Sequence, residues 1–115
     1  MATSIFKLTP SAPVKALDAA SGNSVLSSIF TCPKSVAGSP YTITWQITAT
    51  GSPMSVSTSL LASLDGVNFE EVDSSTTEEI RVLAAFPAAF YQIELDSITG
   101  GTMPTVTVWL MVTNI

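Results

Sequence analysis

Residues 54 to 69 form the segment that most limits what this chain can fold into. Every second position along it suits a buried face, which is the period of a β-strand that is half exposed to water. Asp65 and Gly66 follow this strand, and both residue types tolerate the positive φ angles of a hairpin turn. The segment therefore predicts a β-hairpin whose first strand turns one face toward the core. The residues on that predicted inner face are Met54, Val56, Thr58, Leu60, Ala62 and Leu64.

The rest of the chain is divided in the same way into short alternating segments with turn residues between them. Residues 41–50 show the cleanest alternation, and Trp45 lies on their apolar face. No helix of ordinary length is expected. Strands of this number and spacing predict an all-β fold, an antiparallel β-sandwich that is jelly-roll-like and has about seven or eight strands. Further strands are predicted over residues 24–30, 80–83, 89–95 and 105–113, and a polar loop over residues 73–79.

The first 23 residues differ from the segments that follow, because Pro10 and Pro13 interrupt them. We expect an N-terminal arm over residues 1–23 and a single β-sandwich domain over residues 24–115, with the arm reaching an adjacent chain. Two alternatives stay open: this segment is an edge strand of the same domain, or it holds a short helix around residues 14–20. The apolar residues that would anchor the arm are Ile5, Phe6 and Leu8.

The composition indicates a surface with unusually little charge. Charged residues make up 11% of the chain, against about 25% in an average soluble domain. Serine and threonine number 31, so the polar surface is mostly hydroxyl. A free monomer normally uses charge to stay soluble, so we expect a subunit whose surface is largely covered by other subunits. The alternative is a compact β domain with a hydroxyl-rich exterior.

The strand phase also displaces several large apolar side chains from the core. If alternate residues of the last strand, such as Val108 and Leu110, face inward, Trp109 and Met111 point outward. The same alternation puts Leu61 and Phe90 on the outer face of their strands. We expect these four side chains to form one interaction patch if their strands are neighbours, covered either by another subunit or by the N-terminal arm.

Several classes of function are disfavoured by what the chain lacks. It has no histidine, so the usual general base and the usual zinc ligand are missing, and no nucleotide-binding loop or nucleophile motif is present. We expect no enzyme and no cofactor. A net charge of −5 argues against nucleic-acid binding. A single cysteine, Cys32, excludes an intrachain disulfide, and neither a signal peptide nor an apolar run long enough to span a membrane is evident.

The hairpin region holds the one candidate metal site, for calcium. Its side chains offer the oxygen ligands that calcium prefers, although their spacing does not match an EF-hand loop. A turn-forming aspartate among solvated acids explains the same residues equally well. The candidate ligands are Asp65, Asn68, Glu70 and Asp73.

The segment ITATGSPMSVSTSLLASLDGVNFEEV resembles small virion proteins of tailed bacteriophages, in which an alternating strand leads into a Ser-x-Asp-Gly-x-x-aromatic turn. Here that turn is formed by Ser63, Asp65, Gly66 and Phe69, and the resemblance covers residues 41–113. It implies a virion structural protein that is assembled in the host cytoplasm. A capsid decoration (head auxiliary) protein is favoured, with copies of itself and the major capsid protein as partners. A tail, fibre-base or head–tail junction component is the alternative.

The same turn occurs in discoidin-like carbohydrate- and lipid-binding domains. This chain departs from them because it is shorter and lacks their pair of bracketing cysteines. A carbohydrate-binding module therefore stays a second hypothesis. In it, a surface glycan would stack on Trp109 together with Phe90 or Tyr91.

Overall fold

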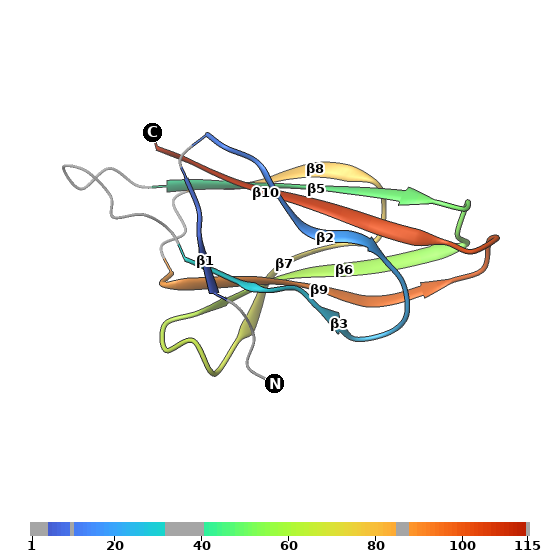
Figure 1. The fold of residues 1–115 in the computed structure, drawn as a ribbon, viewed down its shortest axis with the longest axis horizontal. Coiled ribbons are helices and arrows are strands. Elements are labelled where there is room, and N and C mark those ends of the chain that lie inside the picture. The colour runs from blue at the N-terminus through green and yellow to red at the C-terminus, as the bar shows by residue number, and fades with distance from the viewer. Residues whose placement is uncertain (1–4, 10, 32–40, 85–87, 115) are drawn as a thin grey trace.

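The computed structural model describes residues 5–9, 11–31, 41–84 and 88–114, which form a sandwich of two β-sheets (Figure 1). The described residues form ten strands and no helix, which confirms the all-β fold predicted from the alternation. Within the described ranges, no helix is present that could cross a membrane. The strands are β1 (Ile5–Lys7), β2 (Val14–Ala20), β3 (Val25–Leu26), β4 (Ile29–Thr31), β5 (Tyr41–Thr50), β6 (Ser55–Ser63), β7 (Glu70–Ser75), β8 (Glu79–Ala84), β9 (Phe90–Thr99) and β10 (Thr105–Asn114).

We call the two layers sheet A and sheet B. Sheet A has the strand order β1-β4-β9-β6-β7, with β3 also paired to β9. Sheet B has the order β2-β10-β5-β8. All pairs are antiparallel except β1 with β4, which is parallel. The longest pairing joins β5 to β10 over ten residue pairs, so these two strands form the centre of sheet B.

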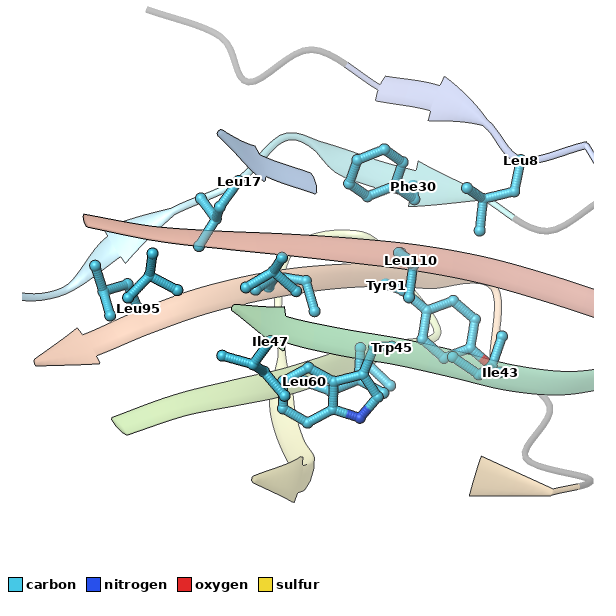
Figure 2. Packing of buried hydrophobic residues seen from close by; sticks show 14 of the residues in the cluster. Leu8, Leu17, Phe30, Ile43, Trp45, Ile47, Leu60, Tyr91, Leu95 and Leu110 are labelled. Carbon is cyan, nitrogen blue, oxygen red and sulfur yellow. The ribbon is translucent and has the colours of Figure 1, made fainter. Parts of the chain in front are cut away.

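The core lies between the sheets and is filled by the inward residues of the alternating strands (Figure 2). Trp45 is fully buried, as are Leu60 of the facing sheet and Tyr91 beside it. The predicted phase of the last strand is confirmed, because Val108 and Leu110 have no exposed surface. The phase fails only at the two ends of the hairpin strand, where Met54 and Leu64 are 87% and 81% exposed.

The described part of the N-terminal segment belongs to the two sheets, which is the edge-strand alternative. Residues 14–20 form the strand β2 and not a helix, because this segment pairs with β10 and turns Leu17 into the core. Leu8 is also buried in the core, at 1% exposure. A chain this short needs these side chains for its own core, so it buries them itself.

Two other predicted strand boundaries differ in the structure. The predicted strand 24–30 is broken into β3 and β4 at Ser27, whose hydroxyl accepts a hydrogen bond from the Ile93 amide at 2.9 Å. The Gln92 side chain donates to the Ser27 carbonyl at 2.8 Å. The predicted loop 73–79 begins later than expected, since β7 continues to Ser75 through its pairing with β6.

The β5–β6 and β9–β10 connections meet at one end of the sandwich (Figure 1). The Thr102 amide donates to the Gly51 carbonyl at 2.9 Å, and the Met54 amide donates to the Thr99 carbonyl at 2.8 Å. Gly51 and Gly101 both have positive φ, at 80° and 72°. Their missing side chains are what allows the two backbones to approach so closely.

Candidate interaction surfaces

The turn between β6 and β7 is held by the side chain of Asp65. Its carboxylate accepts hydrogen bonds from the backbone amides of Val67 and Asn68, at 2.9 and 2.8 Å, and from the Asn68 side chain. The Ser63 hydroxyl donates to the same carboxylate. The Asn68 amide, then the Val67 amide and the side chains of Asn68 and Ser63, hold the pKa of Asp65 far below its ordinary value. The predicted hairpin is formed by β6 and β7, but its turn spans residues 64–69 and is longer than a tight turn at Asp65 and Gly66.

The four candidate calcium ligands do not all converge: Asp65, Asn68 and Glu70 line one hollow beside the β6–β7 turn, and Asp73 does not. Asp65 uses its oxygens inside the turn, and Asp73 faces the space between the sheets, opposite Leu60. The residues that the structure describes hold no group of three or more histidine, cysteine, aspartate or glutamate side chains placed to bind a metal ion. The alternative explanation, a turn-forming aspartate near solvated acids, accounts for Asn68 and Glu70 as well.

Asp73 instead belongs to a charged network that connects the edges of the two sheets. Its carboxylate accepts a hydrogen bond from the Trp45 indole at 2.9 Å and two from Arg81, whose Nη2 lies 2.9 Å from Oδ1. Arg81 also pairs with Glu79 at 3.2 Å, and the Ser75 hydroxyl donates to Glu79. Strand β7 of sheet A is thereby tied to β5 and β8 of sheet B.

This environment changes the pKa of the Asp73 carboxyl. Burial acts to raise it, but the hydrogen bonds from Arg81, Trp45 and the Ser74 amide, with the charge of Arg81, outweigh burial. The pKa of Asp73 is therefore held below its ordinary value. Sequence reasoning missed this network because Asp73 stands in the polar run that was interpreted as a loop.

The outer face of sheet A is acidic. Glu94 and Asp96 of β9 lie beside Glu71 of β7, and the Ser59 hydroxyl is 2.8 Å from Glu71 Oε1 and 2.6 Å from Asp96 Oδ2. A hydroxyl carries one proton, so Ser59 can donate to only one of the two carboxylates at a time. Burial first, then a hydrogen bond with Asp96 and repulsion from Asp96 and Glu71, raise the pKa of Glu94.

We expect Glu94→Gln to raise the melting temperature by a few degrees above neutral pH and to change it little in acid. A raised pKa means that the folded state holds the Glu94 proton more tightly than the unfolded chain does. Stability is therefore lost as pH rises from the ordinary glutamate pKa through the raised one. Gln has no proton to lose, so melting curves of both proteins across pH should converge at low pH. A constant difference at every pH would contradict this explanation.

The outer face of sheet B carries exposed apolar side chains. Ile80 and Val82 of β8 are each 61% exposed, and their rows continue across the sheet to Trp109 and Met111 of β10. The outward residues of β5 between them are threonines and Gln46. A hollow of about 230 Å³ on this face is lined mainly by Pro13, Thr44, Gln46, Ile80, Trp109 and Met111.

The predicted interface residues fall on different parts of the molecule. Trp109 and Met111 lie on the outer face of sheet B as the phase predicts, whereas Leu61 and Phe90 lie on the outer face of sheet A. They do not form one patch, because β10 belongs to the other sheet. Phe90 is covered within the chain, since its ring packs against Gly66, where an added Cβ would lie 3.2 Å from it.

The apolar residues of the predicted arm also lie in different environments. Leu8 is part of the core, as described above, whereas Ile5 and Phe6 are 58% and 53% exposed. The Phe6 ring packs against Phe30, with ring centroids 6.2 Å apart. Whether Ile5 and Phe6 contact another subunit stays a prediction. The exposed pair Ile80 and Val82 was missed, because sequence reasoning did not place β8 at the edge of a sheet.

The aromatic residues proposed to stack on a glycan do not form a platform. Tyr91 is buried in the core at 1% exposure, and Phe90 lies on the opposite sheet from Trp109. The Lys15 ammonium lies over the half-buried Trp109 ring, 5.3 Å from its centroid, where a stacked sugar would compete with it. The structure therefore does not contain the aromatic arrangement on which the glycan-binding hypothesis was based.

Comparisons with known proteins give one structural likeness. No protein family and no curated protein sequence matches the chain. Among solved structures, the chain is similar to the crystal structure of the SPBc2 prophage-derived protein YomS. The TM-score is 0.62 at 16% sequence identity, and the match covers 89% of this chain and 92% of YomS. The likeness extends over nearly the whole of both chains and shows a shared fold.

Proposed function

We propose that this protein is a non-enzymatic structural subunit of a tailed-phage virion, and within the virion a capsid decoration protein. Two findings support a phage origin: the resemblance of residues 41–113 to small virion proteins, and the fold shared with a prophage-derived protein. The partners would be the major capsid protein and further copies of this chain.

The observation that carries this proposal is the outer face of sheet B. The outward side chains of β5, β8 and β10 include no charged residue, and the Lys15 ammonium of β2 lies over the Trp109 ring. The exposed apolar residues are Ile80 and Val82 of β8, and Trp109 and Met111 lie on the same face across β5. Exposed apolar side chains that a fold does not need for its own core mark a contact surface. Lys15 is paired with Asp18 at 3.7 Å, and the outward side chains of the other three strands carry no charge. We therefore expect this face to dock on a capsid through apolar contact and to stay bound as salt is raised.

We expect Trp109→Ser to weaken binding to capsids by at least about tenfold, because a central aromatic residue commonly dominates the energy of an interface. The measurement is co-sedimentation of the purified protein with heads and with tails from a phage that lacks its gene. The control is Leu64→Ser, which removes an 81% exposed apolar side chain from the β6–β7 turn. Full binding by the control and loss by the Trp109 variant are expected.

Each other outcome has a definite meaning. Saturable binding to tails and not to heads would replace the decoration role with a tail role. Binding to neither particle would contradict the virion assignment itself. Equal loss in both variants would show that the outer face of sheet B is not the docking surface.

A further inference from the structure

Three of the four outer strands of this sandwich carry features that discourage pairing with another chain. Strand β1 has only three residues. Strand β7 presents Glu70 and Glu71 and is interrupted by a bulge opposite Leu60 and Leu61. Strand β2 has two irregularities in its pairing with β10, and Ala19 has a positive φ of 51°. Short length, charge and bulges are the usual ways in which natural sheets protect an edge.

Strand β8 is longer than β1, and its two charged residues, Glu79 and Arg81, are paired with each other. Its pairing with β5 is uninterrupted over six residues, and no other strand of the described part of the chain pairs with its outer edge. The residues that point to the outer face, Ile80 and Val82, are apolar and exposed. Arg81, between them, faces the other way and is bound by Asp73 and Glu79, so it places no free charge along the edge. An edge of this kind is a template for another strand.

The distribution of charge favours a second copy of the same chain as that strand. Copies with a net charge of −5 repel one another unless they meet where carboxylates are few or are paired with cations. The carboxylates Glu71, Glu94 and Asp96 lie on sheet A, on the far side of the sandwich from the outer face of sheet B. On β8 itself, Glu79 is paired with Arg81 at 3.2 Å, and the neighbouring Glu78 accepts a hydrogen bond from the Ala49 amide at 2.7 Å. Two copies can therefore meet at the β8 edge with less repulsion than at the outer face of sheet A.

We propose that β8 pairs antiparallel with β8 of a second copy across a two-fold axis. Such a contact is self-complementary, and it joins the Ile80 and Val82 stripes of the two copies on one continuous face. The joined sheet ends in β2 on both sides, and the irregularities of β2 stop further addition. The product is a closed dimer and not a fibre. This proposal rests on the proposed role as an assembly subunit and names the contact between copies.

The first test is the mass in solution by analytical ultracentrifugation, from micromolar to millimolar protein. The wild type should form a dimer whose population rises with concentration, since a six-residue strand pair is small for an interface. Val82→Lys should raise the dissociation constant by at least about tenfold, because it brings a lysine from each copy into the joined β8 strands, where the two like charges repel. The matched control is Val67→Lys, at a 79% exposed position of the β6–β7 turn, which adds the same charge elsewhere.

The second test identifies the strand that pairs. All variants carry Cys32→Ser. The first sample is Val82→Cys protein alone, and the second is a mixture of Ile80→Cys protein with Val82→Cys protein. Val67→Cys protein is the control. Directly opposed residues of antiparallel strands lie within disulfide reach, so one of the two β8 combinations should cross-link on oxidation. A wild type that stays monomeric, or a dimer that neither β8 combination cross-links, would overturn the proposal. Capsid binding by monomeric Val82→Lys protein would leave the virion role standing.

Discussion

Asp73→Ala is expected to lower the free energy of unfolding by about 2–3 kcal/mol, because it leaves the buried Trp45 indole without its acceptor. Trp45 has no exposed surface, and its N–H donates to Asp73 at 2.9 Å. The Asp73 side chain is itself only 13% exposed. The Arg81 side chain is 37% exposed, so water screens its ion pair and the larger share of the loss comes from the indole.

The measurement is chemical denaturation, with Glu70→Ala as the control. Glu70 is an exposed carboxylate of the same strand, and its loss should change stability by no more than about 0.5 kcal/mol. In a Trp45→Phe background, which has no indole N–H, Asp73→Ala should cost clearly less. An equal cost in both backgrounds would show that the indole bond is not the source of the effect.

The same network predicts how stability depends on pH. The folded state holds the pKa of Asp73 below its ordinary value of 3.8, so the folded state prefers the ionised carboxylate. The stability that Asp73 contributes is present above that value and is lost as pH falls through the lowered pKa. Asp73→Asn should remove this part of the acid dependence, and its difference from the wild type should shrink in strong acid.

Local pattern was enough to predict the core strands. In residues 41–50 and 105–113 every second side chain is apolar. This alternation indicates a strand with one buried face, whichever strand lies beside it. Trp45 and Leu110 were therefore assigned to the core correctly. The β6–β7 turn was also predictable, because Asp65 and Gly66 act through hydrogen bonds and backbone angles within a few residues.

What could not be predicted depends on which strands become neighbours. Asp73 lies in a run of polar residues with no period, and only the approach of β7 to β8 supplies Arg81 as its partner. The exposure of Ile80 and Val82 follows from the position of β8 at the edge of its sheet, since a covered strand would bury the same residues. Leu8 and Leu17 enter the core only because β1 and β2 join sheets formed by later strands.

Gly101→Ala is expected to destabilise the fold by at least about 3 kcal/mol, because it combines an unfavourable backbone angle with a clash. Gly101 has a φ of 72°, and a Cβ there would lie 2.3 Å from the Gly51 carbonyl oxygen and 2.8 Å from that of Ser52. Both obstacles are backbone atoms of the neighbouring connection, which is fixed by the hydrogen bond from the Thr102 amide. Neither can move without opening the end of the sandwich.

The matched control for that substitution is Gly22→Ala. Gly22 also has a positive φ, of 109°, but the nearest atom to its added Cβ is a methyl of Val25 at 3.6 Å, which is ordinary contact. This variant should lose only the cost of the backbone angle, roughly 1–2 kcal/mol. Thermal denaturation should therefore show a clearly lower melting temperature for the Gly101 variant. Equal losses of stability in the two variants would mean that the two connections separate easily and that the clash does not contribute to the destabilisation. A larger loss at Gly101 would establish that their contact is what closes this end of the sandwich.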